Sequence, residues 1–312
     1  MASTLKNMFP GNRLLTEHNL PLQEGKVFIV TGANSGLGKE LTKILYSKHA
    51  KVYVAARSES KAKAAIEEVR RLYPTSKGDL VYLHLDLSDL TTIKKSADDF
   101  LAKEQRLDVL FNNAGVMTPP VGSKTAQGYE LQLGVNSIGT FLFTRCLNSI
   151  LTATASSAPP NSVRVVWVSS AAAETAPKPA IDFSNMDYAR DESQWQKYER
   201  SKVGNILHAC EAARRSESNR NGVLHVSLHP GIFPTDLQRT MPGWQACLVK
   251  ALGKDPKYGA YTQLYAGLDP RVENGGFVAP HGRPDKVRKD LCEEELGKKY
   301  WEWTEKQVER YT

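Results

Sequence analysis

The sequence predicts an α/β fold in which helices cover both faces of a doubly wound parallel sheet of about seven strands. Short runs rich in β-branched residues recur along the chain, and stretches with apolar residues at helical spacing lie between most of them. Strands that alternate with helices in this way form parallel sheets buried on both faces. A chain of 312 residues can form one such unit, so we expect a single domain over residues 1–312.

The order of these runs defines the expected elements. Strands are expected at residues 26–32, 51–57, 79–87, 107–115, 162–170, 223–231 and 275–280, and helices at 37–49, 58–74, 197–215 and 258–268. Residues 171–197 and 232–256 contain proline and lack a clear period, so long loops are expected there, the second as a substrate lid. Residues 1–24 would be an N-terminal extension and residues 283–312 a helical C-terminal tail.

The charge and hydropathy of the chain exclude several classes of protein. The 41 Lys and Arg against 34 Asp and Glu give a net charge of +7, but the basic residues are spread out, which indicates a solvated surface and no nucleic-acid partner. The sequence has neither a signal-peptide core nor an apolar run long enough to span a bilayer. Residues 238–254 are mildly amphipathic, which is compatible with a substrate lid and also with a segment that touches a membrane. We expect a soluble cytoplasmic protein without stable membrane insertion.

The cysteines point to no metal or redox motif. Cys146, Cys210, Cys247 and Cys292 lack the paired spacing of a zinc site or of a thiol-redox motif. We therefore expect reduced, mostly buried thiols and no bound metal.

A glycine-rich turn lies between the first expected strand and the first expected helix. In TGANSGLG, glycine occupies positions Gly32, Gly36 and Gly38, and the residues between them include Asn34, Ser35 and Leu37. Missing side chains let the backbone approach a pyrophosphate, and the following helix N-terminus offers unpaired N–H groups. The strand and helix that this motif requires are both present, so these residues are candidates for binding a dinucleotide.

The end of the second strand indicates which dinucleotide. A protein that holds the ribose diol of NAD usually presents a carboxylate there, but this chain has Ala55, Ala56, Arg57 and Ser58. The guanidinium of Arg57 suits a 2′-phosphate, which favours NADP(H), although a solvated arginine in a basic protein is the alternative.

Two Tyr-Lys pairs share the same spacing. Tyr198 and Lys202 in YERSK would share one face of a helix, where the lysine would lower the pKa of the tyrosine by roughly 3 units from its usual value near ~10. Tyr73 and Lys77 in YPTSK are separated by a proline that disfavours helical geometry, so this pair is expected in an exposed turn. Only the first pair is expected to be catalytic.

Five motifs in order along the chain, TGANSGLG, NNAG (112–115), VSS (168–170), YERSK and HPG (229–231), resemble those of the short-chain dehydrogenase/reductase family. The resemblance runs from about residue 25 to residue 282 and is closest in style to retinol-dehydrogenase-type and fungal ketone-reductase members. It implies a Rossmann-type sheet and a nicotinamide cofactor.

The resemblance also implies roles for individual residues. Tyr198 would be the general acid/base, Lys202 its partner and a ribose ligand, Ser170 the donor to the carbonyl oxygen, and Asn136 the holder of a relay water, although the adjacent Ser169 rivals Ser170. Further cofactor contacts would come from Asp86, Leu87, Asn113, Ala114, Gly115, Pro230, Gly231, Ile232 and Thr235.

Together these features predict an NADP(H)-dependent oxidoreductase that reduces a ketone or aldehyde, and reversibly oxidises the alcohol, of an apolar or aromatic small molecule. The alternative is a non-redox NADP(H)-binding sensor or a pericyclase-like reuse of the fold. A homodimer is possible. Trp195, Trp244, Trp301 and Trp303 could stack a substrate, but packing in the core or lid is the simpler expectation.

Overall fold

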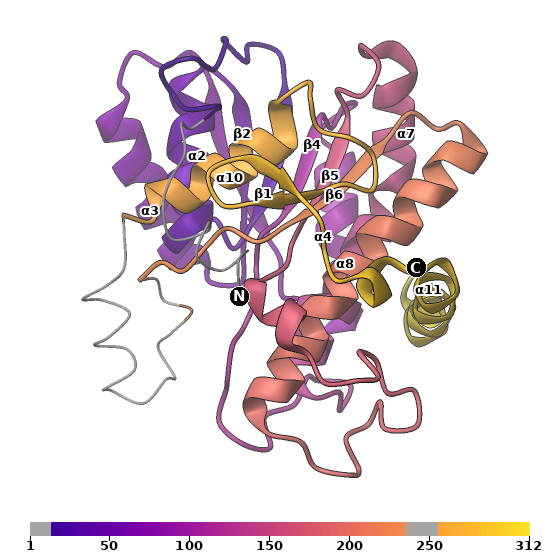
Figure 1. Cartoon of the computed structure of the whole chain (residues 1–312). Coiled ribbons are helices and arrows are strands. Elements are labelled where there is room, and N and C mark those ends of the chain that lie inside the picture. Colours follow the sequence, from indigo (N-terminus) through magenta and orange to yellow (C-terminus); the bar gives the residue numbers. More distant parts are fainter. Residues whose placement is uncertain (1–13, 235–236, 238–254) are drawn as a thin grey trace.

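A computed structural model of the chain describes residues 14–234, 237 and 255–312 (Figure 1). Within them, eight strands form one sheet in the order β3-β2-β1-β4-β5-β6-β7-β8, parallel except for the last pair. The strands are β1 (Val27–Thr31), β2 (Lys51–Ala56), β3 (Asp79–His84), β4 (Val109–Asn112), β5 (Arg164–Val168), β6 (Leu224–Leu228), β7 (Phe277–Ala279) and β8 (Arg283–Asp285). The predicted α/β, Rossmann-type fold class is confirmed.

Helices lie on both faces of the sheet, as Figure 1 shows. They are α2 (Gly36–Ser47), α3 (Glu59–Leu72), α4 (Leu90–Leu101), α5 (Leu131–Leu133), α6 (Thr140–Cys146), α7 (Asn148–Ser157), α8 (Gln194–Asn219), α10 (Lys257–Leu268) and α11 (Glu294–Val308). Shorter pieces are the π-helical η1 (Gly134–Gly139) and the 3₁₀ turns η2 (Ala171–Thr175), η4 (Lys289–Cys292) and η5 (Glu309–Tyr311).

Strands β1, β2, β4 and β5 contribute alternate residues to two separate cores. Phe28 and Val30 of β1 pack with α2, α3 and α10, whereas Val27 and Ile29 pack with α4, α6, α7 and α8. All four side chains are at most 5% exposed, so the β-branched runs are continuous because both strand faces are buried.

The sheet order creates a crevice at the carboxyl ends of β1 and β4. The chain runs outward from β1 through β2 to β3 and then crosses back to β4 on the other side of β1. In open α/β sheets ligands bind at such a switch point, because the loops that follow the two central strands diverge there.

The C-terminal part departs from the expectation in one element. We expected about seven strands and a helical tail over residues 283–312, but Arg283–Asp285 form β8, which pairs antiparallel with β7. This strand has three residues and contains proline, so its sequence carries no alternating pattern. The rest of the tail folds as η4, α11 and η5.

The expected loop at 171–197 also contains regular structure. It begins with the 3₁₀ turn η2, and its last residues form the first turn of α8. Ser193 and Gln196 form a reciprocal capping box there, which starts α8 ahead of the expected residue 197. The predicted lid over 232–256 falls largely on residues 238–254, outside the part of the chain that the structure describes.

The expectation of four reduced cysteines is wrong for two of them. Cys210 in α8 and Cys292 at the end of η4 form a disulfide, with Cα atoms 5.9 Å apart. They are 82 residues apart in sequence, and only the packing of η4 against α8 brings them together. Cys146 is a free thiol, and Cys247 lies outside the described residues.

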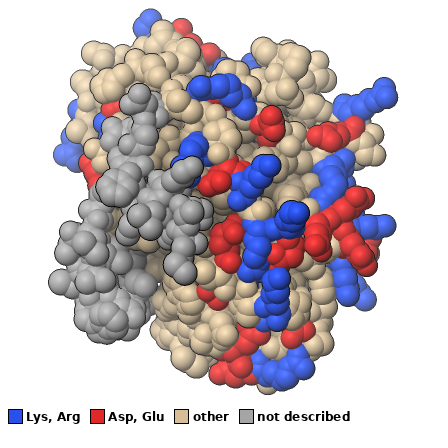
Figure 2. All heavy atoms as spheres, in the orientation of Figure 1, with Lys and Arg blue, Asp and Glu red and all other residues tan. Residues whose placement is uncertain are grey.

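The surface carries both signs of charge. On the face shown in Figure 2, lysines and arginines are interspersed with aspartates and glutamates. Many are close ion pairs, such as Arg215 with Glu211 at 2.8 Å. None of the helices in the described ranges has the length and apolar character needed to cross a bilayer.

Candidate active site

The glycine-rich turn joins β1 to the N-terminus of α2 in the predicted way. Gly32 and Gly36 have φ values of +65° and +53°, which L side chains rarely adopt. Gly38 is required for close packing. A Cβ at this position would lie 2.6 Å from the side-chain Nδ2 of Asn113 and 2.7 Å from the carbonyl oxygen of Gly32. Only glycine therefore allows this turn to lie against the loop that follows β4.

The loop after β4 is fixed to β1 by side-chain amides. Asn113 Nδ2 donates to the carbonyl oxygen of Thr31 at 2.8 Å, and Asn113 Oδ1 accepts from Gln263 Nε2 at 2.9 Å. The N–H of Ala114 donates to Thr31 Oγ1 at 2.9 Å. These bonds hold the carboxyl ends of the two central strands in register at the crevice. A Cβ on Gly115 would lie 3.0 Å from Asn136 Oδ1 and 3.3 Å from Lys202 Nζ, so a larger residue would crowd both side chains.

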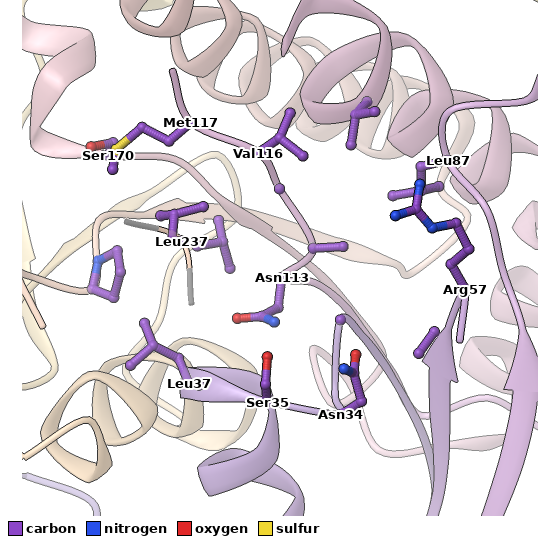
Figure 3. A pocket seen from close by; sticks show the side chains of 18 of the residues that line it. Asn34, Ser35, Leu37, Arg57, Leu87, Asn113, Val116, Met117, Ser170 and Leu237 are labelled. Carbon is purple, nitrogen blue, oxygen red and sulfur yellow. The ribbon is translucent and has the colours of Figure 1, made fainter. Parts of the chain in front are cut away.

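Basic and hydroxyl side chains lie together after β2. Arg57 and Lys61 are exposed, and Ser58 caps α3 by accepting a hydrogen bond from the N–H of Lys61. Arg57 has no ion pair or hydrogen bond with the part of the chain that the structure describes, and it lines the cavity beside Leu87 (Figure 3). This cluster, at the N-terminus of α3, can bind an anion such as a phosphate group.

One cavity of about 810 Å³ brings most of the predicted residues together. Its lining includes the following candidates: Gly32, Asn34, Ser35, Gly36, Leu37, Arg57, Asp86, Leu87, Asn113, Ala114, Gly115, Ser170, Tyr198, Lys202, Pro230, Gly231 and Ile232. Figure 3 shows Arg57 at one end and Ser170 with Met117 at the other. Gly38 and Asn136 do not line it, and Thr235 lies outside the described residues.

Tyr198 and Lys202 lie one turn apart on α8, both at most 4% exposed. Lys202 Nζ is 5.9 Å from the centre of the Tyr198 ring and donates to the carbonyl oxygen of Val168 at 2.9 Å. Burial lowers the pKa of Lys202 to about 8.

The expectation that Lys202 lowers the pKa of Tyr198 is wrong. Burial raises the pKa of Tyr198 to about 12, although a hydrogen bond with Ser170 opposes the rise. Loss of solvation dominates because apolar side chains, among them Met117 and Ala172, enclose the phenol. The phenol is therefore protonated at neutral pH.

The structure distinguishes the two adjacent serines. Ser169 Oγ donates to the backbone carbonyl of Lys202 at 2.7 Å and is buried, which attaches β5 to α8. Ser170 lies half-buried at the cavity, its hydroxyl opposes the rise in the pKa of the neighbouring Tyr198, and its Oγ accepts from the N–H of Ala172 at 3.2 Å. Only Ser170 places its hydroxyl beside Tyr198.

Asn136 lies within the π-helical η1, and its side chain is engaged with the protein. Its Nδ2 donates to the Val116 carbonyl and to Ser201 Oγ, each at 2.9 Å, and its Oδ1 accepts from the Val116 N–H at 2.7 Å. With both amide hydrogens in use, this side chain ties the loop after β4 to α8.

The segment from Ala171 to Ser193, called the insertion below, is anchored to α8 by residues that do not line the cavity. Glu199 accepts a hydrogen bond of 2.6 Å from Thr175 Oγ1. Arg200 donates to Glu192 at 2.7 Å and to the carbonyl oxygen of Ala180 at 3.1 Å. Glu199 and Arg200, between Tyr198 and Lys202, therefore hold the insertion in place, whereas Ser201 accepts a hydrogen bond from Asn136.

The second Tyr-Lys pair lies in the turn that its proline predicts, but only Lys77 is exposed, because Tyr73 is partly buried against the core. Tyr73 is the residue that ends α3, and Pro74 to Gly78 form a turn before β3. Neither Tyr73 nor Lys77 lines the cavity.

Among the cavity residues that sequence reasoning missed or interpreted differently are Ser58, Lys61 and Trp195. Ser58 and Lys61 follow Arg57 directly, and their position at a helix start could have identified them. Trp195 was expected to pack but is 44% exposed and lines the cavity. Gln263, which orients Asn113 from outside the cavity, could have been noticed as a polar residue in an otherwise apolar helix.

Within the described residues, no group of three or more His, Cys, Asp and Glu side chains could hold a metal ion.

Comparisons with known proteins agree with this geometry. A family model described as short chain dehydrogenase matches residues 26–246. The short-chain dehydrogenase/reductase pkfC of Emericella nidulans is 52% identical over 302 residues, covering 95% of this chain and 97% of that protein. A short-chain dehydrogenase/reductase of Phomopsis amygdali is 49% identical and covers 99% and 98% of the two chains.

Solved structures share the fold. An uncharacterized protein from Mycobacterium paratuberculosis superposes with a TM-score of 0.76 at 27% identity, covering 95% of this chain and 97% of that one. RhlG of Pseudomonas aeruginosa, in an active-site complex with NADP, superposes with a TM-score of 0.64 at 21% identity. The superposition covers 84% of this chain and 96% of RhlG. The family model and the close fungal relatives together establish that this chain belongs to the short-chain dehydrogenase/reductase family of oxidoreductases.

Proposed function

We propose that the protein is an NADPH-dependent reductase of ketones or aldehydes with apolar or aromatic substrates, able to run in reverse on the alcohol. One observation carries the proposal: the hydroxyls of Ser170 and Tyr198 lie together at one end of a cavity whose other end presents Arg57. A cavity with a proton donor at one end and an anion site at the other suits a carbonyl beside a phosphorylated dinucleotide.

The two hydroxyls have separate roles in this proposal. Tyr198 holds a proton at its Oη, because burial raises its pKa to about 12, and it gives that proton to the carbonyl oxygen during reduction. Ser170 donates a hydrogen bond to the same oxygen and stabilises the negative charge that develops there. When bound, the cofactor would supply the hydride to the carbonyl carbon.

Lys202 contributes charge and position. With its pKa lowered to about 8, its ammonium keeps most of its charge at neutral pH and lies beside the ring that loses a proton. The same ammonium would hold the ribose hydroxyls of the cofactor. The loop after β4 would line the nicotinamide, and the turn from Gly32 to Gly38 would bind the pyrophosphate.

The preference for NADPH over NADH rests on the residues after β2. The cluster of Arg57, Ser58 and Lys61 offers two cations and a hydroxyl, and β2 ends in Ala56 with no carboxylate to hold a ribose diol. A 2′-phosphate fits such a site because it accepts several charge-assisted hydrogen bonds.

The test is Tyr198→Phe, which removes one hydroxyl and keeps the ring. NADPH oxidation with an accepted ketone should fall by at least about 100-fold, the usual scale for losing a general acid, while NADPH should still bind when titrated by fluorescence. Tyr73→Phe is the matched control and should leave turnover within about twofold. If Tyr198→Phe keeps most of its activity, the mechanism is wrong. If the unmodified protein binds NADPH but reduces no carbonyl compound, a cofactor-binding sensor becomes the better function.

A further inference from the structure

Trp195 is a large exposed aromatic side chain at the reacting end of the cavity. It is 44% exposed, lines the cavity, and its ring centre lies 5.5 Å from that of Tyr198 at an interplanar angle of 40°. By contrast, Trp167 is fully buried and Trp301 is 8% exposed. An indole left open beside a proton donor is suited to contact a ligand, because an offset-stacked aromatic pair gains free energy beyond that of the buried area.

The first turn of α8 fixes the backbone that carries this indole. The capping box of Ser193 and Gln196 fixes the start of the helix, and Gln132 Nε2 donates to the carbonyl oxygen of Gln194 at 3.0 Å. Trp195 and Tyr198 are three residues apart and therefore share a helix face. The platform is pre-formed, which lowers the entropy lost on binding.

The surroundings indicate an uncharged ligand. Among described residues that line the cavity, the charged side chains are Arg57, Lys61, Asp86 and Lys202. The first three follow β2 and β3, away from Tyr198, and Lys202 already donates to Val168.

The same end is otherwise apolar. Met117 and Leu237 pack with Tyr198, and the cavity-lining Ile232 is 73% exposed. Exposed apolar side chains beside a cavity are typical of a surface that an apolar ligand covers. The hydroxyls of Ser170 and Tyr198 can together bind one carbonyl oxygen.

We propose that Trp195 is a specificity-determining residue that stacks on the ring of a neutral, flat aromatic ketone and presents its carbonyl to Ser170 and Tyr198. This rests on the proposed function for the reaction, but the recognition of the aromatic ring stands on Trp195 alone. A saturated ring of the same size would fit less well, because it is puckered and offers no π face.

The test compares two probes with the same skeleton, the aromatic 1-tetralone and the saturated 1-decalone. Titration calorimetry of the full chain with NADP⁺ measures binding, and NADPH oxidation measures kcat and KM. The unmodified protein should prefer 1-tetralone. Trp195→Ala should weaken 1-tetralone binding about tenfold, mostly as a rise in KM, and 1-decalone binding less than about threefold.

Two further variants keep the result interpretable. Trp195→Phe retains a flat ring and should restore most of the preference, which a role in folding alone would not predict. Val121→Ala changes a side chain that is 81% exposed and outside the cavity, and it should alter neither probe.

Equal binding of the two ketones by the unmodified protein, no binding of 1-tetralone, or an equal loss of both probes in Trp195→Ala would each overturn the inference. Failure of the proposed function looks different, since 1-tetralone would then bind selectively through Trp195 without being reduced.

Discussion

Lys202 Nζ donates a hydrogen bond of 2.9 Å to the backbone carbonyl oxygen of Val168, the last residue of β5. Asn205 donates to the same oxygen at 3.0 Å, so two side chains of α8 converge on the end of this central strand. The bond holds the ammonium beside Tyr198, but it replaces only part of the solvation that the buried charge has lost.

A pH-dependent stability difference follows. Burial lowers the pKa of Lys202 to about 8, so between this pH and its unfolded value near ~10.5 the unfolded chain binds more protons, and stability rises with pH. Lys202→Met removes the buried charge. We therefore compare the free energy of unfolding of Lys202→Met with that of the unmodified protein. The advantage of the variant should be larger at pH 7 than above pH 10.5, by on the order of 3 kcal/mol.

The measurement is urea unfolding of both proteins across this pH range. Lys77→Met, which removes an exposed lysine, controls for the loss of a positive charge from a basic protein. A stability difference that does not change with pH would contradict the prediction.

The two adjacent serines should differ in what they contribute. Ser170→Ala removes the hydroxyl beside Tyr198, so turnover should fall about 100-fold, the scale of one lost donor to a developing oxyanion. Ser169→Ala should leave turnover within about threefold but cost about 1 kcal/mol of stability, because it loses a buried bond to the Lys202 carbonyl. Steady-state kinetics and urea unfolding on both variants separate the two effects, and the reverse pattern would make Ser169 the catalytic serine.

Cofactor preference should depend on Arg57. Arg57→Ala should weaken NADPH binding about tenfold or more and leave NADH binding nearly unchanged, since only NADPH carries the 2′-phosphate. Arg71→Ala, an exposed arginine on α3 that does not line the cavity, is the control for net charge. Equal Kd values for NADPH and NADH in the unmodified protein would count against this assignment.

The anchoring of the insertion should depend on Arg200. Its pair with Glu192 is largely buried, with side chains 9% and 16% exposed, so Arg200→Met should cost about 3 kcal/mol by leaving the carboxylate unpaired. Arg190→Met breaks a more exposed pair with Asp182 and should cost less than about 1 kcal/mol. Urea unfolding checks both, and similar losses in the two variants would show that Arg200 does not anchor the segment.

Features carried by local pattern could be predicted from the sequence. The turn at Gly32 and Gly36 needs positive φ angles, and the strand and helix around it show their own periodicities. The helical spacing of Tyr198 and Lys202 placed both on one face, and Pro74 correctly removed Tyr73 from consideration. The two-sided burial of the strands followed from their alternation with helices.

Features that depend on distant parts of the chain could not be predicted. The direction of the pKa shift of Tyr198 depends on burial among residues such as Met117 and Ala172, which lie far from or outside its own helix. The disulfide between Cys210 and Cys292 depends on where η4 packs, and β8 is too short to show a period. Trp195 is 44% exposed and lines the cavity, which its neighbours in sequence do not reveal.

The first turns of α8 carry two separate sets of residues, one at the cavity and one at the insertion, and this separation has an evolutionary consequence. Trp195, Tyr198 and Lys202 face the cavity, whereas Glu199 and Arg200 bind the inserted segment from the remaining sides of the helix. The residues between η2 and α8 can therefore change in length or sequence, because Ser170 follows β5 and Tyr198 lies on α8, and Ser169 joins these two elements directly through the Lys202 carbonyl. New substrates can be acquired in this way while the proton donor stays where it is.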